Sequence, residues 1–273
     1  MQEGPIGVFD SGYGGLTVLK EMVQRLPDYD FLYLGDNARA PYGTRSFETV
    51  YQYTKEAVDW FFKQGCPLVI LACNTASAKA LRTIQQQDLQ QYEPFRRVLG
   101  VIRPTAEVIG NYTQTGHIGI LATPGTVQSQ SYLLEIKKFS PEAHIVQQAC
   151  PLWVPLIENN LHHQPGANYF IESCVQELLQ QDSEIDTLLL GCTHYPIIYD
   201  AIRKAIPTSV QLIAQGGIVA ESLVQYLQRH PDMDQRLSCN GKRIFYTTDN
   251  AADFQSHSAL FYGEEVEVRE TKL

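Results

Sequence analysis

The sequence predicts an α/β fold built from two similar units, each with a parallel sheet flanked by helices. Short apolar runs alternate with helical periodicities along the whole chain, which is typical of such sheets. Two distant segments place a cysteine, Cys73 or Cys192, directly after an apolar run. Residues 6–12 and 118–123 both lead from a strand into a small, hydroxyl-bearing turn. These similarities indicate two related units whose strand ends face one another across a cleft.

The predicted strands are short runs of apolar, often β-branched residues. In chain order they are residues 6–9, 31–34, 68–72, 98–102, 118–121, 188–190, 210–213 and 244–247. Between the early strands, one helix carries an apolar face over residues 16–26, and a second opens at Ser46 and stops at Gly65. From this pattern alone the first unit ends near Val98, and the last strands can join either unit.

Composition narrows the class of protein. The chain has 273 residues with 44% hydrophobic content, enough for a sizeable core in two units. A formal net charge of -9 without a lysine or arginine run argues against a nucleic-acid partner and favours a small-molecule ligand. No apolar run reaches transmembrane length and the first residues do not resemble a signal peptide, so we expect a cytoplasmic protein without membrane contact.

The two cysteines at strand ends are the main candidates for chemistry. A small residue precedes each of Cys73 and Cys192, and hydroxyl or amide side chains follow. Open α/β sheets bind ligands at this edge, and a helix N-terminus there favours a thiolate. Two thiols on opposite walls of a cleft can remove a proton from one face of a carbon and return one to the other. This arrangement predicts racemisation or epimerisation.

The remaining cysteines are not assigned any chemistry. Six cysteines are too few for a disulfide scaffold in a chain of this size, so we expect reduced thiols. Four of them lack the context of a strand followed by polar residues and are interpreted as small buried or incidental thiols: Cys66, Cys150, Cys174 and Cys239.

Polar residues beside the strand ends have two possible roles. The turn that begins with Asp10 and Ser11 is neither a dinucleotide fingerprint nor a phosphate-binding loop. Its carboxylate can orient a thiol or an ammonium group, or it can simply cap a helix. The same choice between capping and binding a small polar ligand applies to the residues that follow the two cysteines, namely Asn74, Thr75, Thr193 and His194.

His194 lies two residues after Cys192, where it can relay a proton or be an ordinary loop histidine. A zinc site made by Cys73, Cys192 and His194 is a rival, but the spacing is unlike that of structural zinc sites and we expect no metal. The segment 41–43, Pro-Tyr-Gly, is interpreted as a turn on sequence alone.

At these residues the sequence resembles bacterial glutamate racemases, of the aspartate/glutamate racemase family, over nearly its whole length. The segments that carry the resemblance are 7–18, 41–43, 72–76, 150–158 and 191–196. The resemblance implies cofactor-independent interconversion of L-glutamate and D-glutamate, which supplies D-glutamate for peptidoglycan synthesis. It also implies two α/β domains related by a pseudo-twofold, 1–97 plus 208–273 and 98–207, with the active site between them, and commonly a homodimer.

The resemblance also implies the role of individual residues. Cys73 would deprotonate D-glutamate with help from Asp10, and Cys192 would deprotonate L-glutamate with help from His194 and Glu158. The residues implied to bind substrate are Asp10, Ser11, Pro41, Tyr42, Gly43, Asn74, Thr75, Thr126, Thr193 and His194, with Thr126 opening the helix after Pro124 and Gly125. No cofactor is expected, and no lysine lies in a motif that suggests a Schiff base.

Some positions depart from the family pattern. Asn37 and Ser77 each replace a more usual threonine, and residues 103–105 replace an acidic residue, proline and glycine at the entry to the second domain. None of these changes removes a proposed acid, base or carboxylate contact. The N-terminal extension of members activated by a cell-wall nucleotide precursor is not seen, so we do not expect that regulation.

Three alternatives remain open on sequence alone. A racemase of another amino acid, such as aspartate, would share the two thiols and differ in its side-chain pocket. A non-catalytic amino-acid sensor would bind glutamate without exchanging its α-hydrogen. A thiol hydrolase would use one cysteine and a histidine and would consume its substrate.

Overall fold

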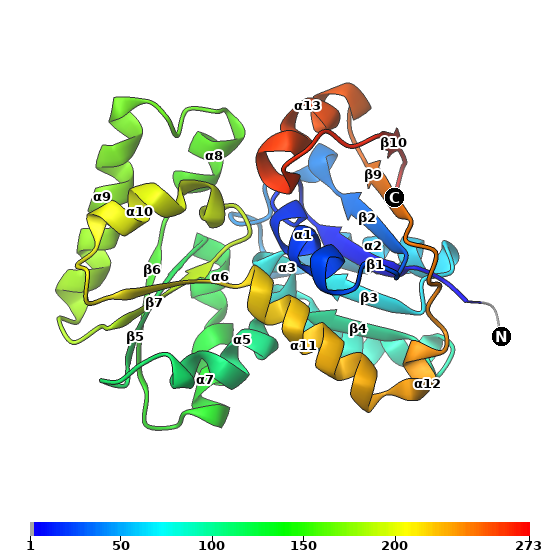
Figure 1. The fold of residues 1–273 in the computed structure, drawn as a ribbon, viewed down its shortest axis with the longest axis horizontal. Helices are drawn as coiled ribbons and strands as arrows, with labels where there is room; N and C mark the ends of the chain where they lie inside the picture. The colour runs from blue at the N-terminus through cyan, green and yellow to red at the C-terminus, as the bar shows by residue number, and fades with distance from the viewer. Residues whose placement is uncertain (1–2) are drawn as a thin grey trace.

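The computed structural model describes residues 3–273 and contains two parallel β-sheets, one in each half of the molecule (Figure 1). The first sheet has six strands in the order β10-β9-β2-β1-β3-β4, and the second has four in the order β6-β5-β7-β8. Every pair of neighbouring strands in these sheets runs parallel. The predicted fold class, with two parallel-sheet α/β units, is confirmed.

All eight predicted strands are present, with ends shifted by at most a few residues. The first sheet contains β1 (Ile6–Asp10), β2 (Phe31–Gly35), β3 (Leu68–Leu71), β4 (Arg97–Gly100), β9 (Arg243–Thr247) and β10 (Val268–Glu270). The second contains β5 (His117–Ala122), β6 (His144–Ala149), β7 (Thr187–Gly191) and β8 (Gln211–Ala214). Strands β6 and β10 were not predicted, because they lie at sheet edges, are partly exposed and lack a continuous apolar run.

Helices connect the strands and cover the sheets. They are α1 (Leu16–Arg25), α2 (Phe47–Lys63), α3 (Asn74–Lys79), α4 (Leu81–Thr83), α5 (Ile102–Val108), α6 (Pro124–Ser129), α7 (Ser131–Phe139), α8 (Trp153–Glu158), α9 (Pro165–Gln181), α10 (Tyr199–Ala205), α11 (Gly216–Arg229), α12 (Pro231–Asp234) and α13 (Ala251–Tyr262). Shorter 3-10 or π turns are η1 (Asn37–Arg39), η2 (Ile84–Asp88), η3 (Leu89–Gln91), η4 (Ile109–Asn111) and η5 (Tyr195–Ile198).

The signals that delimit α2 act as the sequence predicts. The Ser46 hydroxyl accepts a hydrogen bond from the amide of Thr49 at 3.2 Å, which satisfies one free donor of the first turn. Gly65 follows the helix with a φ of 87°, a left-handed conformation that glycine adopts without strain.

The duplication predicted from the sequence is visible in the strand order. The order β2-β1-β3-β4 of the first sheet is repeated as β6-β5-β7-β8 in the second. In this correspondence β3 matches β7, and these are the two strands that precede Cys73 and Cys192. The two thiols therefore occupy equivalent places in the repeated units.

Strand pairing differs from the predicted domain limits at two short segments. Strand β4 pairs with β3, so residues 98–100 belong to the first sheet, although the predicted limit assigned them to the second domain. Strand β8 pairs with β7, so residues 211–214 belong to the second sheet, although the predicted return began at residue 208. A single apolar run does not specify its neighbour, and the pairing partner comes only from the tertiary structure.

The C-terminal part of the chain returns to the first half. Helix α11 packs along α1, and β9 pairs with β2, so that blue and orange segments lie side by side in Figure 1. Apolar residues of α1 and α11, such as Leu19 and Leu223, are buried in one core cluster, whereas Phe61 of α2 is buried in another. Within residues 3–273, no helix has the length and apolar character needed to cross a membrane.

Candidate active site

Both thiols lie at the carboxyl ends of their strands, as the sequence predicts. Cys73 follows β3 and directly precedes α3, and Cys192 follows β7 ahead of a turn and η5. Each residue is only 6% exposed. The two thiols are close enough that negative charge on Cys192 raises the pKa of Cys73. They therefore belong to one site contributed by both halves of the molecule.

The surroundings of Cys73 favour the neutral thiol. Its Sγ lies 3.5 Å from Oγ of Ser11. Burial, followed by the negative charge of Asp10, raises the pKa of Cys73 to about 12. The amide groups at the start of α3 act in the opposite direction and favour the thiolate, but burial has the larger effect.

The surroundings of Cys192 are different. Nδ1 of His194 lies 4.0 Å from Sγ of Cys192, and Nε2 lies 2.9 Å from Oε1 of Glu158. Burial lowers the pKa of His194, but the Cys192 and Glu158 side chains raise it to a net value of about 10. The direction of this shift favours the imidazolium form of His194 beside the Cys192 sulfur.

Asp10 connects the two halves of the site. It ends β1, is fully buried, and accepts hydrogen bonds from the Gly12 amide at 2.9 Å and the Thr193 hydroxyl at 3.3 Å. Burial raises the pKa of Asp10, while the positive charge of His194 and the hydrogen bonds lower it, and the net direction is upward. Asp10 thus organises its own turn and contacts the second half of the molecule.

The glycine-rich turn allows this close approach. A Cβ atom on Gly14 would overlap Oγ1 of Thr193 and Nδ1 of His194. No side chain fits there without displacing these two residues. Gly14 is therefore required by the contact between the first turn and the segment that follows Cys192.

A group of threonine hydroxyls lies between α3 and α6. Oγ1 of Thr75 lies 3.0 Å from that of Thr123 and 3.4 Å from that of Thr126. Thr123 caps α6 through the Thr126 amide at 3.3 Å, and the helix begins at Pro124. Thr126 therefore lies in the first turn of α6 and does not open it. Buried hydroxyls of this kind can bind a carboxylate.

Comparison with known proteins gives an independent indication of the family. The family model described as Asp/Glu/Hydantoin racemase matches residues 6–223, which is most of the chain and includes both thiols.

The chain belongs to the Asp/Glu/hydantoin racemase family.

Individual members of this racemase family match over nearly the full length. A glutamate racemase from Ruegeria sp. (strain TM1040) is 40% identical over 272 residues, which cover 96% of this chain and 97% of the relative. The crystal structure of a glutamate racemase from Bacillus anthracis matches with a TM-score of 0.89 at 32% identity, covering 100% of this chain and 99% of the other. A glutamate racemase from Francisella tularensis, in complex with D-glutamate, matches with a TM-score of 0.85 at 32% identity, covering 100% and 98%.

The segment 41–43, which the resemblance implies to bind substrate, contacts both halves of this racemase-family chain. Pro41 is exposed, and the hydroxyl of the buried Tyr42 donates to the carboxylate of Asp36. The carbonyl of Gly43 accepts a hydrogen bond from the Gly125 amide at 2.7 Å. This segment therefore joins the first half to α6 mainly through its backbone.

Three residues that sequence reasoning did not assign to the site contact it. They are Thr123, Tyr132 and Gln215. The Tyr132 hydroxyl donates to Oδ1 of Asn74 at 2.6 Å and accepts from the Gln215 amide. Nδ2 of Asn74 is buried without a hydrogen-bond partner, which leaves a donor for a ligand. Thr123 had a local signal, since it precedes a proline at the helix start, whereas Tyr132 and Gln215 had none.

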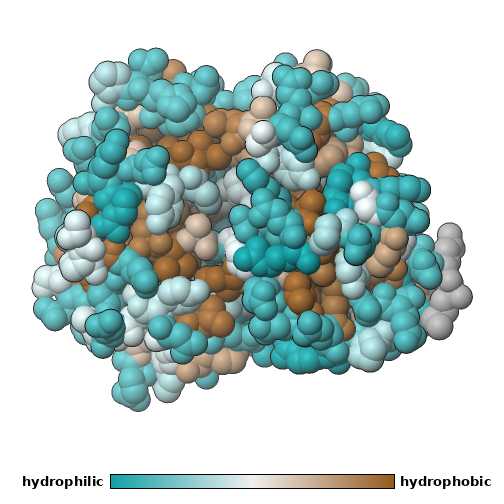
Figure 2. Space-filling view, in the orientation of Figure 1, coloured by the Kyte–Doolittle hydropathy of each residue, from teal (hydrophilic) through white to brown (hydrophobic). Residues whose placement is uncertain are grey.

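Apolar side chains are exposed near α8, the helix that carries Glu158 (Figure 2). Figure 2 shows apolar residues near α8, beside the notch between the two halves. The segments flanking this helix contain the exposed side chains of Leu152 and Leu161.

A separate cavity of about 800 Å³ lies between helices of the two halves. It is lined by residues such as Ser77, Arg103 and Leu223 and by neither thiol.

The three side chains considered as zinc ligands do not form a metal-binding group. In the part of the chain that the structure describes, the one group with suitably close ligand atoms is His117, His144 and Asp182, in the second sheet.

Proposed function

We propose that the chain is a cofactor-independent glutamate racemase in which Cys73 and Cys192 exchange protons with opposite faces of Cα. The equivalent placement of the two thiols after β3 and β7 is the observation that carries this proposal. The activity named for the relatives and the D-glutamate in the Francisella tularensis complex support glutamate as the substrate.

In the direction from L- to D-glutamate, the sulfur of Cys192 takes the α-proton and the thiol of Cys73 gives a proton to the other face. One C–H bond breaks, one forms, and no redox change occurs. The raised pKa of Cys73 suits a proton donor in this direction, and the raised pKa of His194 favours a positive charge beside Cys192. The reverse direction uses Cys73 as the base, and a substrate ammonium group near Cys73 and Asp10 would lower the pKa of that thiol.

The other polar groups would assist removal of the weakly acidic α-proton of the substrate. The hydroxyls of Thr75 and Thr126 and the unpaired amide of Asn74 are donors for a carboxylate on which charge develops during proton removal. Ser11 and Thr193 lie beside Cys73 and Asp10 respectively. Glu158 orients His194, which assists Cys192.

The test is proton NMR of the purified chain with L-glutamate in deuterated water, combined with circular dichroism of the amino acid. Racemisation would introduce deuterium at Cα while the optical signal decays to zero. Cys73→Ala and Cys192→Ala should each abolish racemisation, and full activity in either folded variant would rule out the two-base mechanism. Racemisation of aspartate in place of glutamate would select the alternative substrate, and binding without exchange would indicate a sensor.

We further propose that the product supplies D-glutamate for peptidoglycan. The chain should restore growth to bacteria that need added D-glutamate, whereas the two alanine variants should not. The homodimer implied by the family resemblance and the cytoplasmic location stay predictions, which light scattering and cell fractionation would test.

A further inference from the structure

Two histidines and an aspartate converge at the edge of the second sheet that lies away from the thiols. His117 and His144 are the first residues of β5 and β6 and are direct partners in the strand register. Asp182 follows the last residue of α9, which packs against both strands. The thiol site lies beyond the carboxyl ends of the strands of this sheet, roughly 17 Å along strands of this length.

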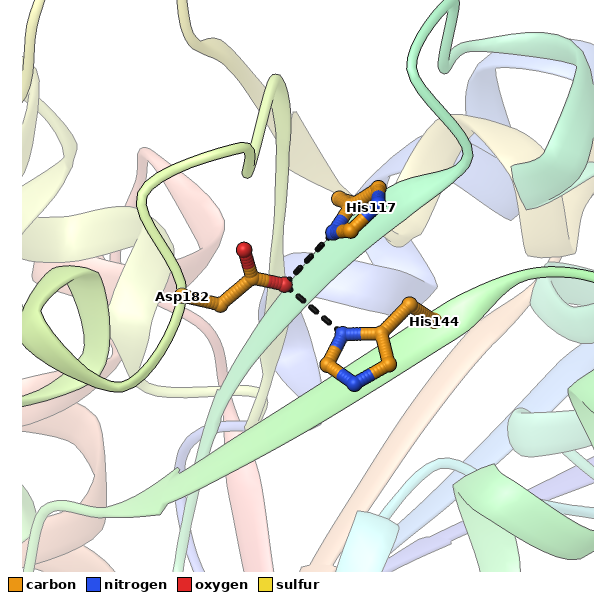
Figure 3. Close-up of side chains that lie close together, drawn as sticks. All are labelled: His117, His144 and Asp182. Atoms are coloured by element: carbon orange, nitrogen blue, oxygen red, sulfur yellow. Dashed lines mark hydrogen bonds and ion pairs between the residues drawn. The ribbon is translucent and has the colours of Figure 1, made fainter.

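The side chains point toward one another. Nδ1 of His117 and Nδ1 of His144 each lie 2.7 Å from the same oxygen, Oδ2 of Asp182 (Figure 3). All three potential ligand atoms lie within 4.8 Å of one another. The turn after α9 uses only one carboxylate oxygen, because Oδ1 accepts a hydrogen bond from the Glu184 amide at 2.9 Å. The convergence of two imidazoles on Oδ2 is additional to that turn.

We propose that His117, His144 and Asp182 form a binding site for a divalent transition metal ion such as Zn²⁺. Two imidazole nitrogens and one carboxylate oxygen suit zinc, copper, nickel or cobalt better than magnesium or calcium, which prefer oxygen ligands. Three protein ligands leave a fourth position for water. The ion would tie the ends of β5, β6 and α9 together.

The geometry needs only a small adjustment. Zinc bonds of about 2.0–2.2 Å in a tetrahedral site place neighbouring ligand atoms about 3.3 Å apart, so each Nδ1 must move away from Oδ2 by a few tenths of an ångström. The His144 side chain is 59% exposed and His117 is 31% exposed, so both rings have room. Each imidazole would bind the ion through an unprotonated Nδ1 and carry its proton on Nε2.

The Asp182 carboxylate is held in position for an ion. Its side chain is only 7% exposed. The Glu184 amide that donates to Oδ1 fixes the carboxylate and would act as an outer-shell partner of the ion.

The test is a zinc titration of the metal-free, full-length chain against a chromophoric chelator. The double variant Cys73→Ala/Cys192→Ala serves as the background, so that zinc held by the active-site thiols is not counted. One equivalent should bind, with affinity reduced at least tenfold by His144→Asn or Asp182→Asn and unchanged by His230→Asn, which replaces an exposed histidine outside the cluster.

Both cluster variants should fold, as circular dichroism would verify. The side-chain oxygen of the amide introduced by Asp182→Asn can still accept the hydrogen bond from the Glu184 backbone, so the turn after α9 is kept. The His144 side chain is more than half exposed, so its replacement leaves no buried cavity.

The absorption spectrum of bound Co²⁺ distinguishes nitrogen and oxygen ligands from thiolate ligands. Co²⁺ in this site should give visible d–d absorption without the sulfur charge-transfer band of a thiolate ligand, and zinc should raise the thermal midpoint of the background protein but not that of its His144→Asn derivative. Absence of binding, or equal affinity in the cluster variants and the control, would overturn the proposal. Racemisation plays no part in these measurements, so their outcome is independent of the proposed function.

Discussion

The hydroxyl of Tyr132 donates a hydrogen bond of 2.6 Å to Oδ1 of Asn74, the residue next to Cys73. Tyr132 belongs to α7 in the second half of the molecule, and Asn74 begins α3 in the first. The bond occupies the acceptor end of the Asn74 amide and leaves Nδ2 without a partner. Orientation of a donor beside one thiol thus depends on a residue from the opposite half.

Tyr132→Phe should therefore weaken catalysis by freeing the Asn74 side chain. We expect a loss of about tenfold in kcat/KM, corresponding to about 1–1.5 kcal/mol for one buried hydrogen bond. If Nδ2 binds the substrate carboxylate equally well in the ground state and in the transition state, this loss should appear mainly as a higher KM. Tyr199→Phe is the matched control, because its hydroxyl donates to the Leu212 carbonyl in the second half. Unchanged kinetics in Tyr132→Phe would contradict the positioning role.

Gly14→Ala should damage the site sterically. The new methyl group would overlap Thr193 and His194, so we expect severe loss of racemisation and a decrease of about 1–3 kcal/mol in the free energy of unfolding. Gly166→Ala is the control, since a Cβ there meets no atom within 4 Å and its φ is not in the left-handed range. Urea unfolding and the deuterium-exchange assay would measure both effects. Activity close to wild type in Gly14→Ala would refute the steric argument.

Glu158→Gln should affect proton transfer at Cys192 more than at Cys73, because Glu158 contacts His194. The two enantiomers have equal free energy, so kcat/KM must fall equally in both directions, by about 10²-fold for loss of a group that assists acid–base catalysis. The larger effect on proton transfer at Cys192 should instead appear as a larger primary isotope effect for Cα-deuterated L-glutamate than for the D-enantiomer. Equal isotope effects would argue against assignment of Glu158 to one side.

His194 should make stability depend on pH. Its pKa rises from an ordinary 6.5 to about 10 in the folded protein, so the stabilisation from its charged form is complete below about pH 6.5 and is lost as pH rises toward about 10. The difference in unfolding free energy between wild type and His194→Gln should therefore shrink across this range. Urea unfolding on both sides of the range would measure it, with His230→Gln as an exposed control. A difference that stays constant or grows with pH would contradict the charged state.

Local signals in the sequence predicted much of the fold correctly. The apolar runs before Cys73 and Cys192 specify buried strands, and Ser46 and Gly65 specify the limits of α2, because capping and burial act over a few residues. Strand β6 was missed because its burial is only partial. The roles of the site residues rest on the family resemblance and stay proposals, although the structure brings Asp10, Thr193 and His194 together.

The sequence by itself determined where each thiol lies relative to its strand and which polar residues follow it. Only the tertiary structure decided that β4 and β8 are edge strands of different sheets and that Tyr132 contacts Asn74. It alone also decided that His117 and His144 share one oxygen of Asp182. It also decided that Cys73 is buried beside Asp10, which raises the pKa of this thiol despite the helix that follows it. The physical reason is that pairing, burial and charge depend on neighbours distant in the chain, whereas strand ends and helix caps depend on adjacent residues.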